Sequence, residues 1–359
     1  MKKIILTGGG TAGHVTPNLA LVPALQEAGY AITYIGSYEG IEKDLVKKAG
    51  LKYYGISSGK LRRYFDWKNF TDPARVIKGF GQARKLIKEI SPDIVFSKGG
   101  FVSVPVVLAA HSLGVPVIIH ESDMTPGLAN RIASRGATRF CCNFPETMSH
   151  LPEGKSVLTG SPIRTELRYG DRARGLEFCG FKEDKAVLMI MGGSIGSVFI
   201  NNAVRESLDI LQQNFQVIHL CGKGNLDPAL EGREGYRQFE YISDELPDLF
   251  AMADLIISRA GANAICELLA LHLPNILIPL SLGASRGDQI LNAASFEKQG
   301  FSYVIQEEDV TAETLVKAVD HVREHSDEYK KAMEQSGQLD SIAKIVNLIE
   351  ECAVEAKKS

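Results

Sequence analysis

Three glycine-rich turns each follow an apolar segment in this chain of 359 residues. They lie at residues 8–13, 99–100 and 192–196. Glycines let backbone N–H groups approach a phosphate closely, and the start of the helix that follows favours negative charge. One such turn is equally consistent with a tight strand-to-helix connection. Three of them indicate phosphate binding at the carboxyl edges of parallel sheets, where open α/β folds bind ligands.

The first turn, residues 8–13, also reads as the G-x-G-x-x-G signature of dinucleotide-binding folds. That function needs an acidic residue at the end of the second strand to bind the ribose. Here the second strand ends at Ser37 and no acid follows before Glu39, and the corresponding strand after residues 192–196 ends at 220–223 without one. Because both turns lack the acid, we do not predict a nicotinamide enzyme. We expect no cofactor.

The turns must be positioned by alternating strands and helices. In the first half, apolar runs at 3–7, 31–35, 93–97 and 115–120 predict strands, and helices are expected at 16–28 and 104–113. Such continuously apolar runs are typical of parallel strands covered by helices on both faces. The alternation predicts an α/β doubly wound fold.

The second half repeats this plan. Strands are expected at 186–191, 216–221, 254–258 and 275–279, with helices at 198–214 and 263–271. We therefore predict two Rossmann-like domains, residues 1–162 and 163–340, which face a cleft. A final helix at 341–355 carries an apolar stripe (Ile342, Ile345, Val346, Ile349, Cys352) that must pack on something, and we expect it to return to the first domain.

Composition limits the function further. Residues 1–164 carry a net charge of +9 and residues 165–359 a net charge of −12, so the two halves are expected to meet different partners. The six cysteines form no Cys-x-x-Cys pair, which predicts neither a zinc finger nor a disulfide scaffold. The uncharged stretches 99–119 and 268–285 are broken by prolines, so we expect a helix and a strand in each rather than a membrane span.

Several motifs, taken together and in order, resemble one known family. They are Gly-Gly-Gly-Thr-Ala-Gly-His at 8–14, Ser-Lys-Gly-Gly-Phe-Val-Ser at 97–103, His-Glu at 120–121, Gly-Ser-Pro-Ile-Arg at 160–164, Gly-Gly-Ser at 192–194, Arg-Ala-Gly-Ala at 259–262 and Asp-Gln-Ile-Leu-Asn at 288–292. The chain resembles the MurG family of GT-B glycosyltransferases over nearly its whole length. It departs from the common family pattern at Ala12, at Ser122-Asp123 and at Asp288.

The resemblance implies an inverting, metal-independent transfer of N-acetylglucosamine in peptidoglycan synthesis. The donor is UDP-N-acetylglucosamine, and the acceptor is the 4-hydroxyl of undecaprenyl-diphospho-muramoyl-pentapeptide. A peripheral enzyme at the cytoplasmic face of the cell membrane, associated with a cell-wall synthesis complex, is the expected setting. The alternatives are a GT-B transferase that uses another lipid acceptor, such as diacylglycerol, and a non-catalytic UDP-sugar-binding protein.

On the donor side, the resemblance implies that Ser194 and the amides around Gly193 bind the diphosphate, with Arg164 beside it. Fixed N–H donors and a helix dipole can stabilise a departing diphosphate without a metal. Glu267 would bind the ribose hydroxyls and the backbone of Ile242 would bind uracil. The remaining donor contacts implied are Thr11, Ala12, Gly13, Asn130, Ala262, Asn263 and Gln289.

On the acceptor side, the attacking hydroxyl must lose a proton. His14 lies at a helix start, where the dipole disfavours the imidazolium and keeps a base available near neutral pH. Glu121 competes for this role, because burial on its apolar strand would raise the pKa of its carboxyl group. His14 could alternatively orient the loop or bind the acceptor diphosphate. The loops at Gly10 and at Gly99-Gly100 are expected to hold that diphosphate.

A basic and aromatic segment at 60–88 predicts contact with an anionic membrane surface. Nine Lys and Arg residues are interspersed there with aromatic residues, and Arg62, Arg63, Phe65 and Trp67 are the expected membrane contacts. Basic side chains contribute about 1 kcal/mol each near anionic lipid, and aromatic residues favour the interface. A solvated helix face is the alternative. Nucleic-acid binding is not expected, given the acidic second half.

Overall fold

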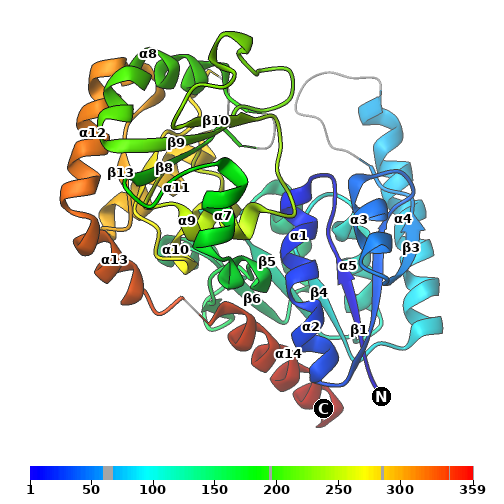
Figure 1. The fold of residues 1–359 in the computed structure, drawn as a ribbon. Helices are drawn as coiled ribbons and strands as arrows, with labels where there is room; N and C mark the ends of the chain where they lie inside the picture. The colour runs from blue at the N-terminus through cyan, green and yellow to red at the C-terminus, as the bar shows by residue number, and fades with distance from the viewer. Residues whose placement is uncertain (60–67, 194–195, 284–286, 339, 359) are drawn as a thin grey trace. The chain divides into compact units, whose positions relative to one another are not determined.

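The computed structural model describes residues 1–59, 68–193, 196–283, 287–338 and 340–358, with the side chains of 68–73 and 358 left out. The chain divides into two compact units (Figure 1). Unit 1 comprises Met1–Arg164 and Asp340–Ser359, and unit 2 comprises Thr165–Leu339. The chain therefore leaves unit 1 near the predicted boundary and returns to it for the last helix.

Unit 1 contains a seven-stranded parallel sheet in the order β3-β2-β1-β4-β5-β6-β7. Its strands are β1 (Lys2–Thr7), β2 (Tyr30–Ser37), β3 (Lys52–Ile56), β4 (Ile94–Ser97), β5 (Val117–Glu121), β6 (Arg139–Cys142) and β7 (Ser156–Leu158). The strand order reverses between β1 and β4, which pair directly. Ligands of doubly wound folds bind at this switch point, beyond the carboxyl ends of the strands.

Helices cover both faces of this sheet (Figure 1). They are α1 (Ala12–Ala20), α2 (Val22–Glu27), α3 (Ile41–Lys48), α4 (Lys68–Ile90), α5 (Ser103–Ser112), α6 (Leu128–Ala133) and α14 (Ser341–Lys358), with short 3-10 turns η1 (Ser134–Gly136) and η2 (Pro145–His150). The prediction of a single helix at 16–28 is wrong. The segment begins at Ala12 and divides at Leu21, because Pro23 lacks the N–H that would continue the first helix.

The apolar face of α14 is buried in unit 1. Ile345 and Ile349 are fully buried in one core cluster with Ile4 and Phe96 of the sheet and Leu25 of α2. Figure 1 shows α14 beside α2, near the N-terminus. The end of the chain is thus part of the core that the beginning of the chain builds.

Unit 2 contains a six-stranded parallel sheet in the order β10-β9-β8-β11-β12-β13. Its strands are β8 (Ala186–Met191), β9 (Phe215–Leu220), β10 (Tyr236–Phe239), β11 (Leu255–Ser258), β12 (Asn275–Leu277) and β13 (Tyr303–Val304). Its helices are α7 (Arg172–Cys179), α8 (Val198–Asn214), α9 (Leu246–Met252), α10 (Ala262–Ala270), α11 (Asp288–Lys298), α12 (Ala312–Glu324) and α13 (Ser326–Glu334), with 3-10 turns η3 (Thr165–Tyr169), η4 (Pro228–Leu230) and η5 (Glu307–Asp309). The predicted doubly wound α/β class is confirmed for both units.

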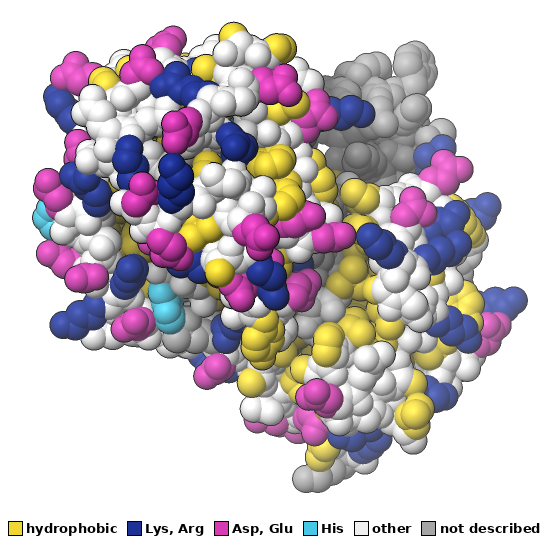
Figure 2. All heavy atoms as spheres, in the orientation of Figure 1, with side chains coloured by type: hydrophobic (Ala, Val, Ile, Leu, Met, Phe, Trp, Pro, Cys, Tyr) yellow, Lys and Arg dark blue, Asp and Glu magenta, His cyan; other side chains and the backbone are white. Residues whose placement is uncertain are grey.

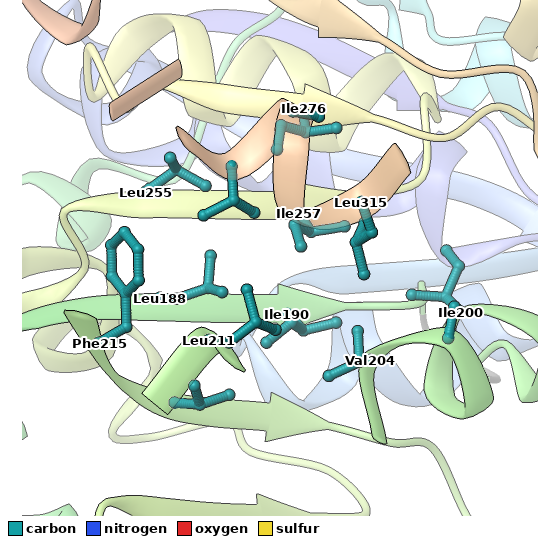
Figure 3. Close-up of a cluster of buried hydrophobic side chains, with 14 of the residues drawn as sticks. Leu188, Ile190, Ile200, Val204, Leu211, Phe215, Leu255, Ile257, Ile276 and Leu315 are labelled. Atoms are coloured by element: carbon teal, nitrogen blue, oxygen red, sulfur yellow. The ribbon is translucent and has the colours of Figure 1, made fainter. Parts of the chain in front are cut away.

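The core of unit 2 lies between its sheet and the pair of helices α8 and α12 (Figure 3). Ile190 of β8 and Ile257 of β11 point toward Val204 of α8 and Leu315 of α12, and all four side chains are fully buried. This packing fixes α8 on the strand that precedes it. Because the strand, the glycines and the helix follow one another in the chain, the packing also fixes Gly192 and Gly193 after β8 and Gly196 before α8.

Within the described part of the chain, no helix is both long enough and apolar enough to cross a membrane. The uncharged stretch 99–119 instead forms α5 and the start of β5, as expected. The second stretch, 268–285, begins in α10 and continues through β12.

Candidate functional site

The loops that follow β1 and β4 touch each other at the switch point of unit 1. Gly100 has a φ of +84°, and a Cβ there would lie 2.2 Å from the carbonyl oxygen of Gly9. Only glycine fits such a position, on grounds of both conformation and space. The two glycine turns predicted to bind the acceptor diphosphate, at Gly10 and at Gly99-Gly100, are therefore brought together.

His14 lies in the first turn of α1, half-buried beside these loops. Its Nδ1 is 3.0 Å from the carbonyl oxygen of Lys98, and because a carbonyl only accepts, Nδ1 carries the hydrogen. Burial and then the charge of Lys98 lower the pKa of the imidazole, against the opposing effects of that hydrogen bond and of Glu42. His14 is thus a neutral imidazole at pH 7 with its lone pair on Nε2, the form that a general base needs.

Lys98 connects His14 to the end of β5, and sequence reasoning missed it. The residue is 1% exposed, and its Nζ lies 2.7 Å from Nδ1 of His120 and 2.6 Å from Oγ of Ser122. His120 in turn donates from Nε2 to the carbonyl oxygen of Gly160 at 2.9 Å. Burial, and then the charge of Lys98, hold the pKa of His120 well below its ordinary value, so this ring is neutral and accepts from the ammonium.

Glu121 is buried, and its carboxylate is surrounded by donors from its own loop. Oε1 accepts from the amides of Ser122 (2.9 Å) and Asp123 (3.2 Å). Oε2 accepts from the amide of Gly127 (3.0 Å) and from Nδ2 of Asn130 (2.8 Å). Burial raises the pKa of this carboxyl group, as predicted, although its hydrogen bonds act in the opposite direction. The geometry suits a residue that shapes the loop between β5 and α6.

We expect Glu121→Gln to destabilise unit 1 by about 1–3 kcal/mol, because the new amide N–H would face two donors, Gly127 N and Asn130 Nδ2. Denaturant unfolding measures the change. The acidic limb of the pH profile of kcat/KM should stay in place. Loss of that limb in the glutamine variant would instead identify Glu121 as the titrating base.

An acidic residue does reach the end of β2, although it lies further along the chain than Glu39, the first acid after that strand. Glu42, on α3, is fully buried, and it accepts from the amides of Ser37 (3.0 Å) and Gly10 (3.2 Å). Burial acts to raise the pKa of Glu42, but hydrogen bonds from Ser37 and Gly10 outweigh it and the pKa is lowered. The carboxylate is therefore engaged by the protein's own loops, through the amides of Ser37 and Gly10.

In unit 2, the glycine turn after β8 leads into α8, a helix of 17 residues. Gly196 has a φ of +81°, and a Cβ there would lie 2.1 Å from the carbonyl oxygen of Cys221, so the turn lies against the end of β9. Gly193 is exposed, with open space where a side chain would stand. Ser197 caps α8 by accepting from the amide of Ile200 at 3.3 Å. Exposed backbone at the start of a long helix is the expected geometry for an anion.

A buried ion pair ties this turn to three other loops of unit 2. Arg259, which follows β11, is 7% exposed and pairs with Glu307 of η5. Its Nη2 donates to Oγ of Ser197 at 2.7 Å, and its Nη1 donates to the carbonyl oxygen of Ile278 at 3.1 Å. Arg259 therefore holds the cap residue of α8, and the sequence motif 259–262 gave no sign of this structural role.

The other predicted donor contacts of unit 2 also lie beyond the carboxyl ends of its strands. The buried residue Ile242 is in the loop between β10 and α9. Ala262, Asn263 and Glu267 belong to α10, and Gln289 begins α11, where its Oε1 accepts from the amide of Leu280 at 3.2 Å. The structure does not describe Ser194.

The remaining predicted residues belong to unit 1 or lie outside the described residues. Thr11, Ala12 and Gly13 form the start of α1. Ala12 adopts a helical conformation, so its Cβ causes no strain there. Asn130 is buried, with Nδ2 directed at Glu121, and Arg164 ends the first segment of unit 1. Arg62, Arg63, Phe65 and Trp67 lie outside the described residues.

No group of three or more His, Cys, Asp and Glu side chains is placed to hold a metal ion in the part of the chain that the structure describes. The charged side chains beside the glycine turns include Lys98, Glu42 and Glu121 in unit 1 and the Arg259–Glu307 pair in unit 2.

Two family models match this chain. The glycosyltransferase family 28 N-terminal domain matches residues 4–141, and the glycosyltransferase family 28 C-terminal domain matches residues 187–349. The first match covers β1 to β6 of unit 1, and the second covers the sheet of unit 2 and continues into α14.

Named relatives match the chain over nearly its full length. The UDP-N-acetylglucosamine–N-acetylmuramyl-(pentapeptide) pyrophosphoryl-undecaprenol N-acetylglucosamine transferase of Lachnospira eligens is 63% identical over 98% of this chain and 99% of its own. The protein of the same name from Clostridium botulinum is 59% identical over 97% and 99%. The crystal structure of MurG from Acinetobacter baumannii, 26% identical, superposes with a TM-score of 0.78 over 98% of this chain and all of that one. The resemblance to the MurG family is confirmed, and the chain belongs to glycosyltransferase family 28.

Proposed function

We propose that this chain transfers N-acetylglucosamine from UDP-N-acetylglucosamine to undecaprenyl-diphospho-muramoyl-pentapeptide, a step of peptidoglycan synthesis. The observation that carries the proposal is the full-length identity of 58–63% with transferases that bear this activity in their names. The two glycine edges support it, since both substrates contain a diphosphate.

Unit 2 is proposed to bind the donor. The amide of Gly193 and the start of α8 would supply N–H donors for the UDP diphosphate. Negative charge grows on this diphosphate as it departs, and preorganised dipoles stabilise such charge most strongly in the transition state. Glu267 would accept hydrogen bonds from the ribose hydroxyls, and Arg164 would add positive charge near the diphosphate.

Unit 1 is proposed to bind the acceptor and supply the base. Nε2 of His14 takes the proton of the muramoyl 4-hydroxyl while that oxygen attacks the anomeric carbon of the donor sugar. The bond from the anomeric carbon to the UDP oxygen breaks, and UDP leaves with the electron pair, which inverts the configuration in one displacement. Glu121 keeps the loop after β5 in shape rather than taking the proton, because both its oxygens already accept from backbone and Asn130 donors.

The direct test measures UDP release from UDP-N-acetylglucosamine with a short-chain version of the lipid acceptor, in the presence of EDTA. We expect turnover and incorporation of labelled sugar into the muramoyl lipid. Incorporation into diacylglycerol instead would support the other lipid transferase. Donor binding without turnover would support a non-catalytic sugar-nucleotide-binding protein.

We also propose that unit 1 docks on an anionic membrane surface, at the cytoplasmic face of the cell membrane. On α4 the basic residues Arg75, Lys78, Arg84, Lys85 and Lys88 are all exposed. Ile77, between the first two of them, is 72% exposed. Figure 2 shows Lys and Arg side chains gathered at the edge of unit 1 where Figure 1 draws α3 and α4. An apolar side chain among exposed cations is the composition that interfacial helices use.

Charge reversal on this helix should weaken binding to anionic vesicles. We expect the triple variant Lys78→Glu, Lys85→Glu, Lys88→Glu to bind phosphatidylserine-containing vesicles on the order of 100-fold more weakly, since each lysine contributes about 1 kcal/mol. Vesicle co-sedimentation at fixed salt measures this. The matched control reverses three exposed lysines of unit 2, Lys298, Lys330 and Lys331, and should bind normally. Equal losses in both triple variants would show that only total charge matters.

A further inference from the structure

Lys98 acts on His14 through two different groups. Its backbone carbonyl accepts from Nδ1 of the imidazole at 3.0 Å. Its side chain, which ends in the ammonium group, is buried. The family motif at 97–103 contains this lysine, but the phosphate-binding interpretation of the motif uses only its glycines. A buried ammonium is costly unless it is held by good acceptors, so its position at this edge requires a reason.

The acceptors that hold the ammonium come from the neighbouring strand. Nδ1 of His120 lies 2.7 Å away and Oγ of Ser122 lies 2.6 Å away. His120 must present a lone pair at Nδ1, because its Nε2 donates to the carbonyl oxygen of Gly160. Both of these partners are uncharged acceptors. The positive charge of Lys98 acts on His14 as well as on His120.

We propose that Lys98 is a positioning residue for the acceptor-side base: its carbonyl selects the tautomer of His14, and its ammonium, held by His120 and Ser122, places a positive charge in the surroundings of the imidazole. This inference rests on the proposed role of His14 as the base. The residue acts through His14 and does not itself touch the substrate.

Two charged side chains act on His14 from the elements around α1, and they oppose each other. The positive charge of Lys98, after β4, lowers the pKa of the imidazole, whereas the negative charge of Glu42, on α3, raises it. A third titratable group, His120 at the end of β5, is neutral and acts only by holding Lys98. Removing the two charges one at a time should therefore move the titration of His14 in opposite directions.

The test compares Lys98→Met with Glu42→Gln. Lys98→Met keeps the backbone carbonyl and much of the side-chain volume but removes the charge. We expect the acidic limb of kcat/KM, and the pKa of His14 followed by NMR, to rise by about one pH unit, a tenfold loss of activity on the acidic side. Glu42→Gln should move both in the other direction. A uniform loss of kcat/KM at every pH, with the titration of His14 unchanged, would overturn the proposal.

Two additions make the outcome unambiguous. Lys98→Gln is also uncharged but can still donate to His120, so it carries the same test if the methionine variant does not fold. The NMR titration, with the His14 signal assigned through His14→Gln, is made on the free full-length protein. A shift there with no effect of His14→Gln on turnover would leave the action of Lys98 standing and refute the base assignment, so the two failures are distinguishable.

Discussion

Replacing His14 with alanine is expected to lower kcat by 10²- to 10⁴-fold, on the order of the contribution of a positioned general base. In the proposed mechanism the side chain presents its Nε2 lone pair to the acceptor, because Nδ1 is bound to the carbonyl oxygen of Lys98. The affinity for UDP-N-acetylglucosamine should change much less than kcat. Steady-state UDP release with the lipid acceptor at saturation measures the effect.

The control for this substitution is His111→Ala. His111 is an exposed histidine near the end of α5 in the same unit, and its removal should leave kcat unchanged. Circular dichroism should show the same thermal transition for both variants. A His14→Ala enzyme that retained more than a tenth of the wild-type kcat would contradict the assignment of His14 as the base.

Replacing Arg259 with methionine is expected to destabilise unit 2 by roughly 3–5 kcal/mol, the range seen when one partner of a buried ion pair is removed. Glu307 would remain with an uncompensated charge, and Ser197 would lose the donor that holds it at the start of α8. We expect the start of α8, the proposed binding site of the donor diphosphate, to loosen as a result. Denaturant unfolding, combined with hydrogen exchange of α8, measures both consequences.

Two further variants separate the ion pair from general damage. The double variant Arg259→Met with Glu307→Gln should recover part of the lost stability, because no unpaired charge remains. Lys317→Met removes an exposed pair with Glu313 in the same unit and should change stability little. If the double variant were no more stable than Arg259→Met, the buried charge of Glu307 would not be the cause of the loss.

The parts of the site that sequence reasoning found are local in the chain. A strand, a glycine turn and a helix are consecutive, so the order of residue types is enough to place Gly8, Gly99 and Gly192 at the sheet edges. The parts it missed are contacts between loops far apart in the chain. Lys98 meets His120 and Glu42 meets Gly10 only after the strands have paired, and no local pattern marks such a meeting.

The assignment of Glu121 shows the same limit. Its position at the end of an apolar strand correctly predicted burial and a raised pKa. The sequence could not show that Gly127 and Asn130 donate to it, because the loop after β5 turns back on the strand. Burial alone is compatible with a proton acceptor and with a loop anchor, and only the number and direction of the donors separate the two.

The return of α14 to the core of unit 1 has a consequence for the order of events during synthesis. As the nascent polypeptide emerges from the ribosome, the segment 1–164 appears first, yet Ile345 and Ile349 must still arrive to fill its interior. Unit 2 is a single uninterrupted segment, so it can mature as soon as it has been made. The portion translated first is thus the last to be completed, and a message cut short before codon 341 would yield a molecule with an open apolar groove.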